Sequence, residues 1–325
     1  MASFREIKKR MSRPVITNSK NMFFLSRTAP PVHERINTLG FNTNNSKLSD
    51  TSKGPVVLFT NARDEKNIKE WAVHHLLLGF DNVFIFDHKS KIPIKNLLGG
   101  YDPRIVVERC EMNRAPKLPL MNIALRKARS MRASWFIYLD ADEFIVLPKY
   151  NSIRAFLSHY SFYDAVLVNW LMFGTNNLVK EPSGLIMDNY TKSCQHLDKH
   201  IKMFVKPFAA KYSDNPHFYH VVNNNKVCNI KNKIVREPLW YANVNLHFNQ
   251  APAFIAHYVN QSEETYRKRK INIPRDDING FRTFDPNIHK HYNDKENQIV
   301  KNLYAQRVRD YLIAKLREKS SRFPK

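Results

Sequence analysis

The chain has 325 residues, of which 43% are hydrophobic and 25% are charged, a composition typical of a globular protein. Lysine and arginine outnumber aspartate and glutamate by 52 to 29, and the net charge of +23 favours anionic partners such as nucleic acid, a membrane surface or phosphorylated ligands. The three cysteines form no CxxC pattern, which argues against a cysteine zinc site or a disulfide scaffold. No Walker A, G-x-G-x-x-G or G-x-S-x-G motif occurs.

No apolar run has the length that a bilayer span requires. The first such run, residues 22–26, is too short for a signal-peptide core or a membrane span. The sequence therefore predicts a soluble, cytoplasmic protein without a transmembrane anchor. Residues 1–53 lack sustained periodicity and are rich in Asn, Ser, Thr and Lys, so we expect a poorly ordered or peripheral arm there.

From residue 56 onwards, short apolar runs alternate with helical patterns. Helical spacing of apolar residues covers 65–80 and 120–131, and Gly79 is a natural stop for the first of these helices. Apolar runs typical of buried strands lie at 56–60, 82–87, 104–109 and 135–140. This order predicts an α/β fold with a largely parallel sheet and helices on its faces.

Polar residues follow three of the predicted strands. They occupy 60–65, 87–90 and 140–143. Ligands of α/β sheets bind outside the carboxyl ends of the strands, so three polar strand ends at one edge predict a binding site.

The third strand end carries Asp140 and Asp142 after the apolar run "WFIYL". Residues two apart can be aimed at one point, and their hard oxygen ligands suit Mg²⁺ or Mn²⁺ bound to a substrate diphosphate. The competing interpretation is an acidic turn or a helix N-terminus. A D-x-D triplet by itself is weak evidence for either.

Four longer stretches of the sequence are more specific than the D-x-D triplet alone. They are 61–90 ("NARDEKNIKEWAVHHLLLGFDNVFIFDHKS"), 135–148 ("WFIYLDADEFIVLP"), 169–177 and 247–270. In order and spacing they resemble glycosyltransferase family 92 and the related family-2-like glycosyltransferases. The resemblance implies a GT-A type, Rossmann-like mixed sheet flanked by helices, in one domain at 54–293. The arm at 1–53 and a C-terminal helix with a basic tail at 294–325 lie outside that domain.

The resemblance also implies an activity: metal-dependent, inverting transfer of a hexosyl or pentosyl group from a UDP- or GDP-linked sugar to a glycan or glycoprotein acceptor. Carried over by position, the residues that hold the donor nucleotide are Thr60, Asn61, Arg63, Glu65 and Asp87. Asp140 and Asp142 hold Mn²⁺ or Mg²⁺ and the donor diphosphate, and a late histidine, His257 or His217, completes the metal shell. For the catalytic base, which must reach the acceptor, the sequence offers Asp188 first, with Glu143 and Glu263 as alternatives.

Two questions stay open at this point. The aromatic side chain of Trp170 could be part of the core or a platform for a sugar ring. The alternative function is a basic nucleic-acid-binding protein or a metal-dependent nuclease, which rests on the net charge and the carboxylate pair. Nucleic-acid binding requires a continuous basic stripe, and the basic tails do not supply one, so nucleic acid is not the expected partner.

Overall fold

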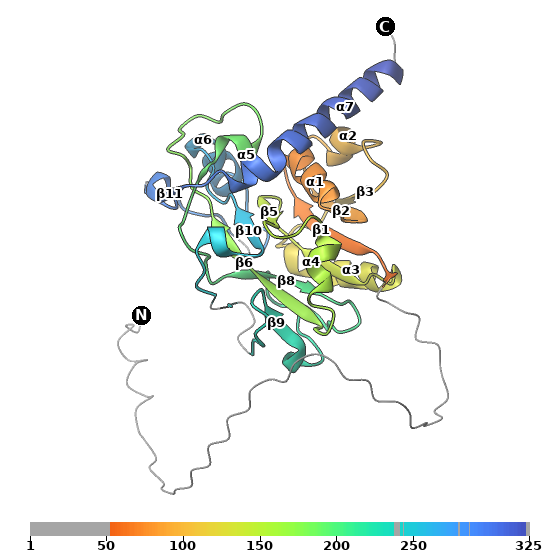
Figure 1. Ribbon diagram of the computed structural model, residues 1–325. Helices are drawn as coiled ribbons and strands as arrows, with labels where there is room; N and C mark the ends of the chain where they lie inside the picture. Colours follow the sequence, from red (N-terminus) through yellow and green to blue (C-terminus); the bar gives the residue numbers. More distant parts are fainter. Residues whose placement is uncertain (1–52, 237–240, 243, 279, 286, 323–325) are drawn as a thin grey trace, which may run out of the picture. The chain divides into compact units, whose positions relative to one another are not determined.

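The computed structural model describes residues 53–322, except 237–240, 243, 279 and 286. The N-terminal arm predicted at 1–53 thus lies outside the described residues, apart from its last position. The described residues belong to one compact unit. A mixed nine-stranded sheet flanked by helices forms its centre (Figure 1), which confirms the predicted fold class.

The strand order along the sheet is β3-β2-β1-β4-β8-β6-β10-β5, with β9 paired beside β6. The strands are β1 (Val56–Ala62), β2 (Asn82–His88), β3 (Ile105–Cys110), β4 (Trp135–Tyr138), β5 (Glu143–Val146), β6 (Ala165–Met172), β8 (Ile201–Val205), β9 (Val227–Asn229) and β10 (Phe254–His257). The four strands predicted from apolar runs are the parallel part, β1 to β4. Two strands run the other way, because β8 is antiparallel to β4 and β6, and β5 is antiparallel to β10.

This arrangement gives the sheet two functionally different edges. At the carboxyl edge β1, β2 and β4 end and the polar segments begin. At the amino edge Val56 pairs with Trp135, and Ala165 pairs with both Val205 and Val227. The loops before β1, β4, β6 and β9 and the loop after β8 therefore meet at the amino edge.

The α-helices are α1 (Ile68–Leu77), α2 (Ile94–Leu98), α3 (Lys117–Ser130), α4 (Ile153–Ser158), α5 (Ile186–Asn189), α6 (Glu263–Tyr266) and α7 (Gln306–Arg322). Three of the helices, α1, α2 and α3, lie in the crossovers between the parallel strands β1 to β4, and the others follow later in the chain. The chain moves from β1 outward to β2 and from β3 back to β4, so right-handed crossovers put α1 and α3 on opposite faces. As predicted, α1 buries Trp71 and Leu76, and the chain leaves it at Gly79, whose φ of +95° glycine adopts without strain.

Short elements complete the chain. They are a two-stranded ribbon of β7 (Lys192–Ser193) and β11 (Lys295–Glu296), 3-10 turns at Asn224–Lys226, Phe248–Gln250 and Ile288–Lys290, and π-helical turns at Arg267–Ile271 and Lys301–Ala305. The C-terminal helix α7 packs across α1 (Figure 1). Beside it, Tyr304 Oη accepts a hydrogen bond of 2.8 Å from the backbone N–H of Leu147. The C-terminal helix is thus anchored to the sheet domain.

Candidate active site

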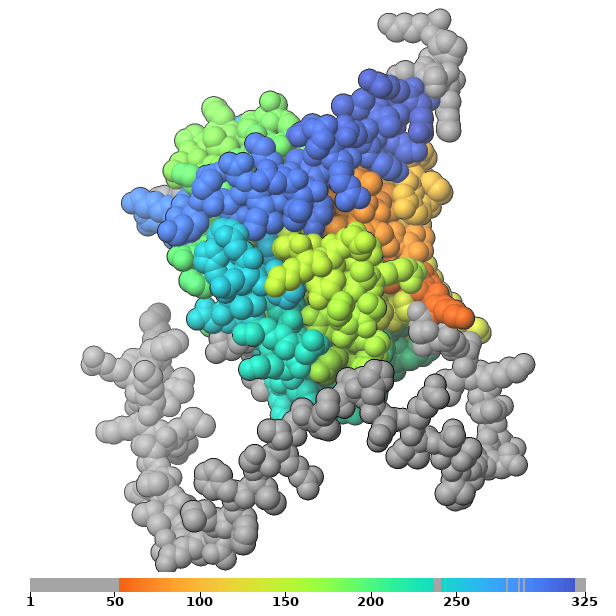
Figure 2. Space-filling model, in the orientation of Figure 1, coloured from red at the N-terminus to blue at the C-terminus, as the bar shows by residue number. Residues whose placement is uncertain are grey.

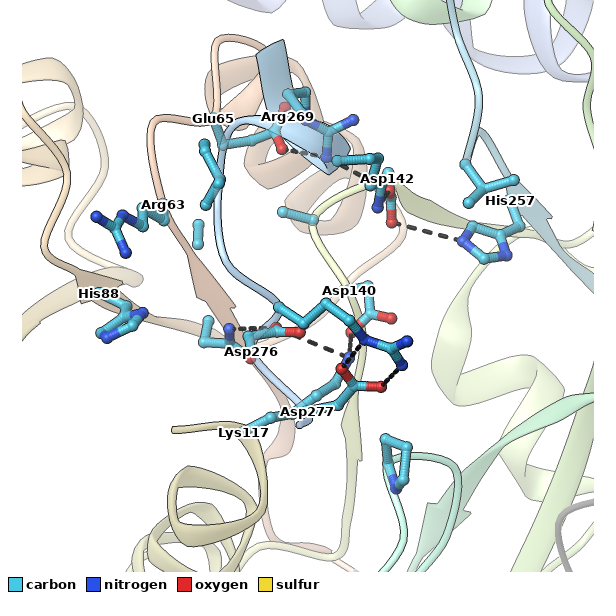
Figure 3. A pocket seen from close by; sticks show the side chains of 18 of the residues that line it. Arg63, Glu65, His88, Lys117, Asp140, Asp142, His257, Arg269, Asp276 and Asp277 are labelled. Carbon is cyan, nitrogen blue, oxygen red and sulfur yellow. Dashed lines mark hydrogen bonds and ion pairs between the residues drawn. The ribbon is translucent and has the colours of Figure 1, made fainter. Parts of the chain in front are cut away.

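A charged cavity of about 310 Å³ lies at the carboxyl edge of the sheet. Arg63 and His88 lie on one side of it and His257 on the other (Figure 3). Its acidic lining residues are Glu65, Asp140, Asp142, Asp276 and Asp277, and its basic ones are Arg63, Lys117, Lys202, Arg269, Lys270, Arg275 and Arg282. Seven basic side chains against five acidic ones make the cavity suited to an anionic ligand.

Asp140 follows β4 and is paired with two lysines. Lys117 at the start of α3 makes an ion pair with its Oδ1, and Lys202 Nζ on β8 lies 3.3 Å from Oδ2. Burial would raise the pKa of Asp140, but the two ammonium groups outweigh burial and hold that pKa well below its usual range. Asp140 is therefore a carboxylate at neutral pH.

Asp142 has a separate set of partners. Lys270 Nζ lies 2.7 Å and Arg269 Nη2 3.3 Å from its Oδ2, while His257 Nε2 lies 3.6 Å from Oδ1. Burial again acts to raise the pKa of Asp142, and Lys270 with the other partners lowers it well below the usual value. The imidazole reaches this position because His257 pairs with Glu143 in the β10–β5 ladder.

Glu143 supports the motif from behind. Its side chain is fully buried and does not line the cavity, its Oε2 accepts a hydrogen bond of 2.8 Å from the backbone N–H of Asp140, and Lys202 Nζ lies 3.5 Å away. Burial raises the pKa of Glu143 to about 8, although Lys202 acts in the opposite direction. The structure thus gives Glu143 a role in fixing the Asp140–Asp142 turn rather than a position beside a bound acceptor.

Residues 273–277 and Arg282 form another wall, which the sequence did not predict. Asn61 Nδ2 donates to Asp276 Oδ2 at 2.7 Å, and Tyr138 Oη donates to Asn61 Oδ1 at 3.0 Å. The backbone N–H of Lys117 donates to the Asp276 carbonyl at 2.9 Å. Asn61 therefore faces the cavity, as predicted, and there it contacts Asp276.

Of the other residues predicted to bind the nucleotide, Arg63 and Glu65 also line the cavity. Glu65 Oε2 lies 2.5 Å from Arg269 Nη2. Four buried atoms of lining residues have no hydrogen-bond partner among the described residues: Arg63 Nε, Glu65 Oε1, Trp170 Nε1 and His257 Nδ1. Unpaired buried polar atoms are uncommon in native proteins, and they often mark functional sites.

The structure does not bring Thr60 or Asp87 to the cavity. Both side chains are buried, and neither lines it. Asp87 accepts hydrogen bonds from the backbone N–H groups of Ser90 and Ile94 at 3.1 and 2.9 Å. Burial acts to raise the pKa of Asp87, but these hydrogen bonds lower it below its usual value. The carboxylate thus holds the β2–α2 connection, and the next residue, His88, lines the cavity in its place.

Asp188 is also outside the cavity. It lies in α5 and forms an ion pair with Arg309 of α7. Asp188, which was predicted as the catalytic base, therefore lies at the contact between α5 and the C-terminal helix α7.

The two candidate histidines both line the cavity, and both rings contact Trp170. The ring centroids of His257 and His217 lie 4.3 and 5.1 Å from that of Trp170. His217 Nδ1 lies 3.1 Å from the Ile201 carbonyl oxygen, and burial lowers the pKa of His217 to about 3. Trp170 itself lines the cavity, and its ring stacks on His200 with a centroid distance of 5.3 Å.

The predicted metal site is not assembled. Among the residues that the structure describes, no group of three or more His, Cys, Asp and Glu side chains is arranged to hold a metal ion. Oxygens of both Asp140 and Asp142 are already in contact with lysine ammonium groups, which a divalent cation would have to displace. The donor atoms in this arrangement therefore do not fit the predicted Mn²⁺ or Mg²⁺ ion.

Fold and cavity together define an α/β protein with a polar ligand site at the carboxyl edge of its sheet. The sequence model of glycosyltransferase family 92 matches residues 57–311, and the chain belongs to this family. The resemblance seen in the sequence is thereby confirmed.

Similar proteins include two curated members of the same family. A family 92 protein of Ricinus communis is 28% identical over 154 residues, which cover 43% of this chain and 26% of the relative. One of Oryza sativa subsp. japonica is 24% identical over 208 residues, which cover 62% of this chain and 32% of the relative. The chain thus spans about a third of the length of these relatives or less.

Solved structures with a likeness include TarS 1–349 of S. aureus. At 13% identity, 63% of this chain and 61% of that chain superpose with a TM-score of 0.38. For the complex of TarS with UDP, the identity is 17%, the coverage is 36% of each chain and the TM-score is 0.29. Within the described ranges, no helix combines the length and the apolar character that crossing a membrane requires.

Proposed function

We propose that this chain transfers a sugar from a nucleoside-diphosphate sugar to a hydroxyl acceptor. The observation that carries the proposal is the convergence of four basic side chains on the two carboxylates of the D-x-D motif, in a cavity at the carboxyl edge of the sheet. These side chains are Lys117, Lys202, Arg269 and Lys270. Family membership supports the reaction class, and the surplus of basic side chains supports a diphosphate as the bound group.

The chemistry follows from the charge that develops during transfer. When the bond between the anomeric carbon and the diphosphate breaks, negative charge grows on the departing diphosphate oxygens. Cationic side chains already in place stabilise that charge without reorganising, which is a large term in group-transfer catalysis. Lys117 contacts Asp140 and Lys270 contacts Asp142, so we assign the diphosphate to the part of the cavity beside these two ammonium groups.

The nucleoside and the sugar occupy the remaining lining in this proposal. Asn61, Arg63 and Glu65 face the nucleoside, as the resemblance implies. Trp170 is the aromatic residue of the lining, and we assign it to the C–H surface of a sugar ring.

An inverting reaction needs a base within hydrogen-bond reach of the acceptor hydroxyl. Asp188 and Glu143 do not line the cavity, whereas Asp276 and Asp277 do, and we assign the base to this pair.

We leave a divalent cation out of this mechanism, because each carboxylate of the motif is in contact with an ammonium group. The four basic side chains supply the positive charge that the ion would supply.

A donor panel tests the proposal. The full chain is incubated with several UDP- and GDP-sugars, and release of the nucleoside diphosphate is measured together with ligand-detected NMR binding. We expect one nucleotide class to bind and to be turned over slowly by hydrolysis even without an acceptor. Lys117→Met should abolish that turnover, while the exposed Lys149→Met should not. Cleavage of single-stranded nucleic acid without binding of any nucleotide sugar would favour the nuclease alternative.

A further inference from the structure

The amino edge of the sheet, opposite the cavity, carries a second distinctive surface. Three large apolar side chains protrude there: Phe162 is 88% exposed, Val222 65% and Phe208 58%. Large exposed apolar side chains gathered on one face of a protein mark interaction sites.

These side chains belong to one contiguous surface, because hydrogen bonds join the loops that carry them. Lys206 Nζ donates to the Ser161 carbonyl at 2.7 Å, next to Phe162. The N–H of Val222 donates to the Ala209 carbonyl at 2.8 Å, next to Phe208.

The hairpin that contains β9 joins the same surface. Tyr163 Oη donates to the Asn232 carbonyl at 3.2 Å, and the N–H of Asp164 donates to the Lys226 carbonyl at 2.8 Å. Figure 2 shows the segments coloured for residues near 160 and near 230 side by side at the lower end of the view.

The surroundings of the apolar side chains are strongly basic. From 206 to 236 the chain contains Lys206, Lys211, Lys226, Lys231, Lys233 and Arg236, but a single acidic residue, Asp214. Lys226, Lys231 and Lys233 are exposed. We call Phe162, Phe208, Val222, Lys226, Lys231 and Lys233 the amino-edge patch.

We propose that the amino-edge patch docks on the surface of an anionic lipid bilayer. Aromatic and aliphatic side chains that protrude singly from loops can enter the interface between headgroups and acyl chains, while lysines beside them attract anionic headgroups. Both properties occur together on this surface.

Nucleic acid would be the other polyanion for such a patch, but the side chains favour lipid. Val222 offers neither a stacking face nor a hydrogen bond to a base. Of the five exposed basic residues at 206–236, four are lysines (Lys211, Lys226, Lys231 and Lys233), whereas bidentate base recognition relies on arginine, here Arg236 alone. Docking at the amino edge would also leave the cavity at the carboxyl edge open to water-borne ligands.

Vesicle co-sedimentation of the full chain tests the proposal. The probes are vesicles of phosphatidylcholine alone and vesicles that also contain phosphatidylserine. We expect binding to the anionic vesicles that weakens with added salt, and little binding to the neutral ones. Absence of binding to the anionic vesicles would overturn the proposal.

Two variants address the two properties of the patch. Phe162→Ser with Phe208→Ser, and separately Lys226→Glu with Lys231→Glu, should each lower the partition coefficient by about tenfold or more. All four positions are exposed, so the variants should fold, and circular dichroism and thermal melting verify this.

Matched controls lie at the other edge of the sheet. Ile92 is 63% exposed, and Lys91 and Lys95 are exposed beside it, after β2. Ile92→Ser, and Lys91→Glu with Lys95→Glu, should bind anionic vesicles as the unaltered chain does.

If the patch variants bind normally, or the controls lose as much affinity, the positive charge of the whole chain and not the patch drives binding, and the proposal is wrong. It is also wrong if the patch variants lose affinity for a single-stranded RNA in a gel-shift assay while vesicle binding is unchanged.

Discussion

Lys270 Nζ lies 2.7 Å from Oδ2 of Asp142, although the two residues are 128 positions apart in the chain. The π-helical turn at Arg267–Ile271 brings Lys270 and Arg269 to the motif from a segment that reads, in sequence, as a run of solvated charges. The second carboxylate of the D-x-D motif is therefore compensated by the protein itself.

This contact leads to a prediction for donor binding. We expect Lys270→Met to weaken the affinity for UDP or GDP by about tenfold to a hundredfold, because a charge-assisted hydrogen bond contributes about 1.5–3 kcal/mol. Isothermal titration calorimetry measures the change. Lys268→Met is the matched control, since Lys268 is 58% exposed and pairs with Glu264 and Glu181 instead. Equal affinity of Lys270→Met and the unaltered chain would remove Lys270 from the diphosphate site.

Chelation of divalent cations tests whether basic side chains or a metal ion compensate the charge of the bound diphosphate. With EDTA present, we expect the nucleoside diphosphate to bind within about threefold of its affinity in Mn²⁺, because Lys117, Lys202, Arg269 and Lys270 carry the compensating charge. Calorimetry in the two buffers checks this. A loss of more than about tenfold, restored by Mn²⁺ and absent in Asp142→Asn, would show that the carboxylates exchange their lysines for a cation when the donor binds.

Asp188 and Arg309 should matter for stability and not for turnover. We expect Asp188→Asn to lower the free energy of unfolding by up to about 1 kcal/mol, since the ion pair is partly exposed. Turnover per folded molecule should stay within about twofold. Denaturant titration and a donor-hydrolysis assay measure the two quantities, and Arg309→Gln should reproduce both. A loss of turnover in Asp188→Asn that Arg309→Gln does not share would restore the residue to the catalytic machinery.

Glu70 gives a prediction about pH. It is buried in α1 and accepts hydrogen bonds of 2.7 and 3.1 Å from the N–H groups of Ile186 and Met187. Burial raises the pKa of Glu70 from 4.5 to about 8, against the effect of these hydrogen bonds. Between these two values the folded chain keeps a proton that the unfolded chain loses. The free energy of unfolding should therefore fall as pH rises through this window, by up to about 1.4 kcal/mol per pH unit from this group.

Glu70→Gln should reduce that slope, because glutamine stays neutral at every pH. At pH near 6 the variant should lie within about 1 kcal/mol of the unaltered chain, whereas Glu70→Ala should cost roughly 2–3 kcal/mol by leaving two N–H groups unpaired. Denaturant titrations across the window measure both, with the exposed Glu111→Gln as control. If glutamine costs as much as alanine near pH 6, Glu70 is ionised in the folded chain.

Local patterns in the sequence were sufficient to predict the first four strands of the sheet. The apolar runs at β1, β2, β3 and β4 and the helical spacing of α1 depend on neighbours along the chain, so their prediction succeeded. Asn61, Asp140 and Asp142 at the cavity follow from the rule that ligands bind at the carboxyl ends of strands.

The rest of the cavity depends on contacts between distant segments. Lys117, Lys202 and Lys270 look like solvated lysines in the sequence, and only the tertiary fold turns them toward the motif. Asp87 failed as a cavity residue for a local reason: its carboxylate accepts the free N–H groups of the following turn, which competes with any ligand. The prediction for Asp188 depends on its position in the chain alone, and its ion pair with Arg309 has no signature in the sequence.

Glu143 is buried between the Asp140 backbone and Lys202, and this position limits which substitutions related sequences can accept there. A neutral residue at Lys202 would leave Glu143 without a basic partner and Asp140 with Lys117 alone, and a neutral residue at Glu143 would leave Lys202 facing Asp140 alone. Breaking one member of a buried charged group costs more than replacing the group as a whole. Homologous sequences should therefore change Asp140, Glu143 and Lys202 together. Glu143 beside the D-x-D motif and Lys202 in the middle of β8 should co-vary, although 59 positions separate them.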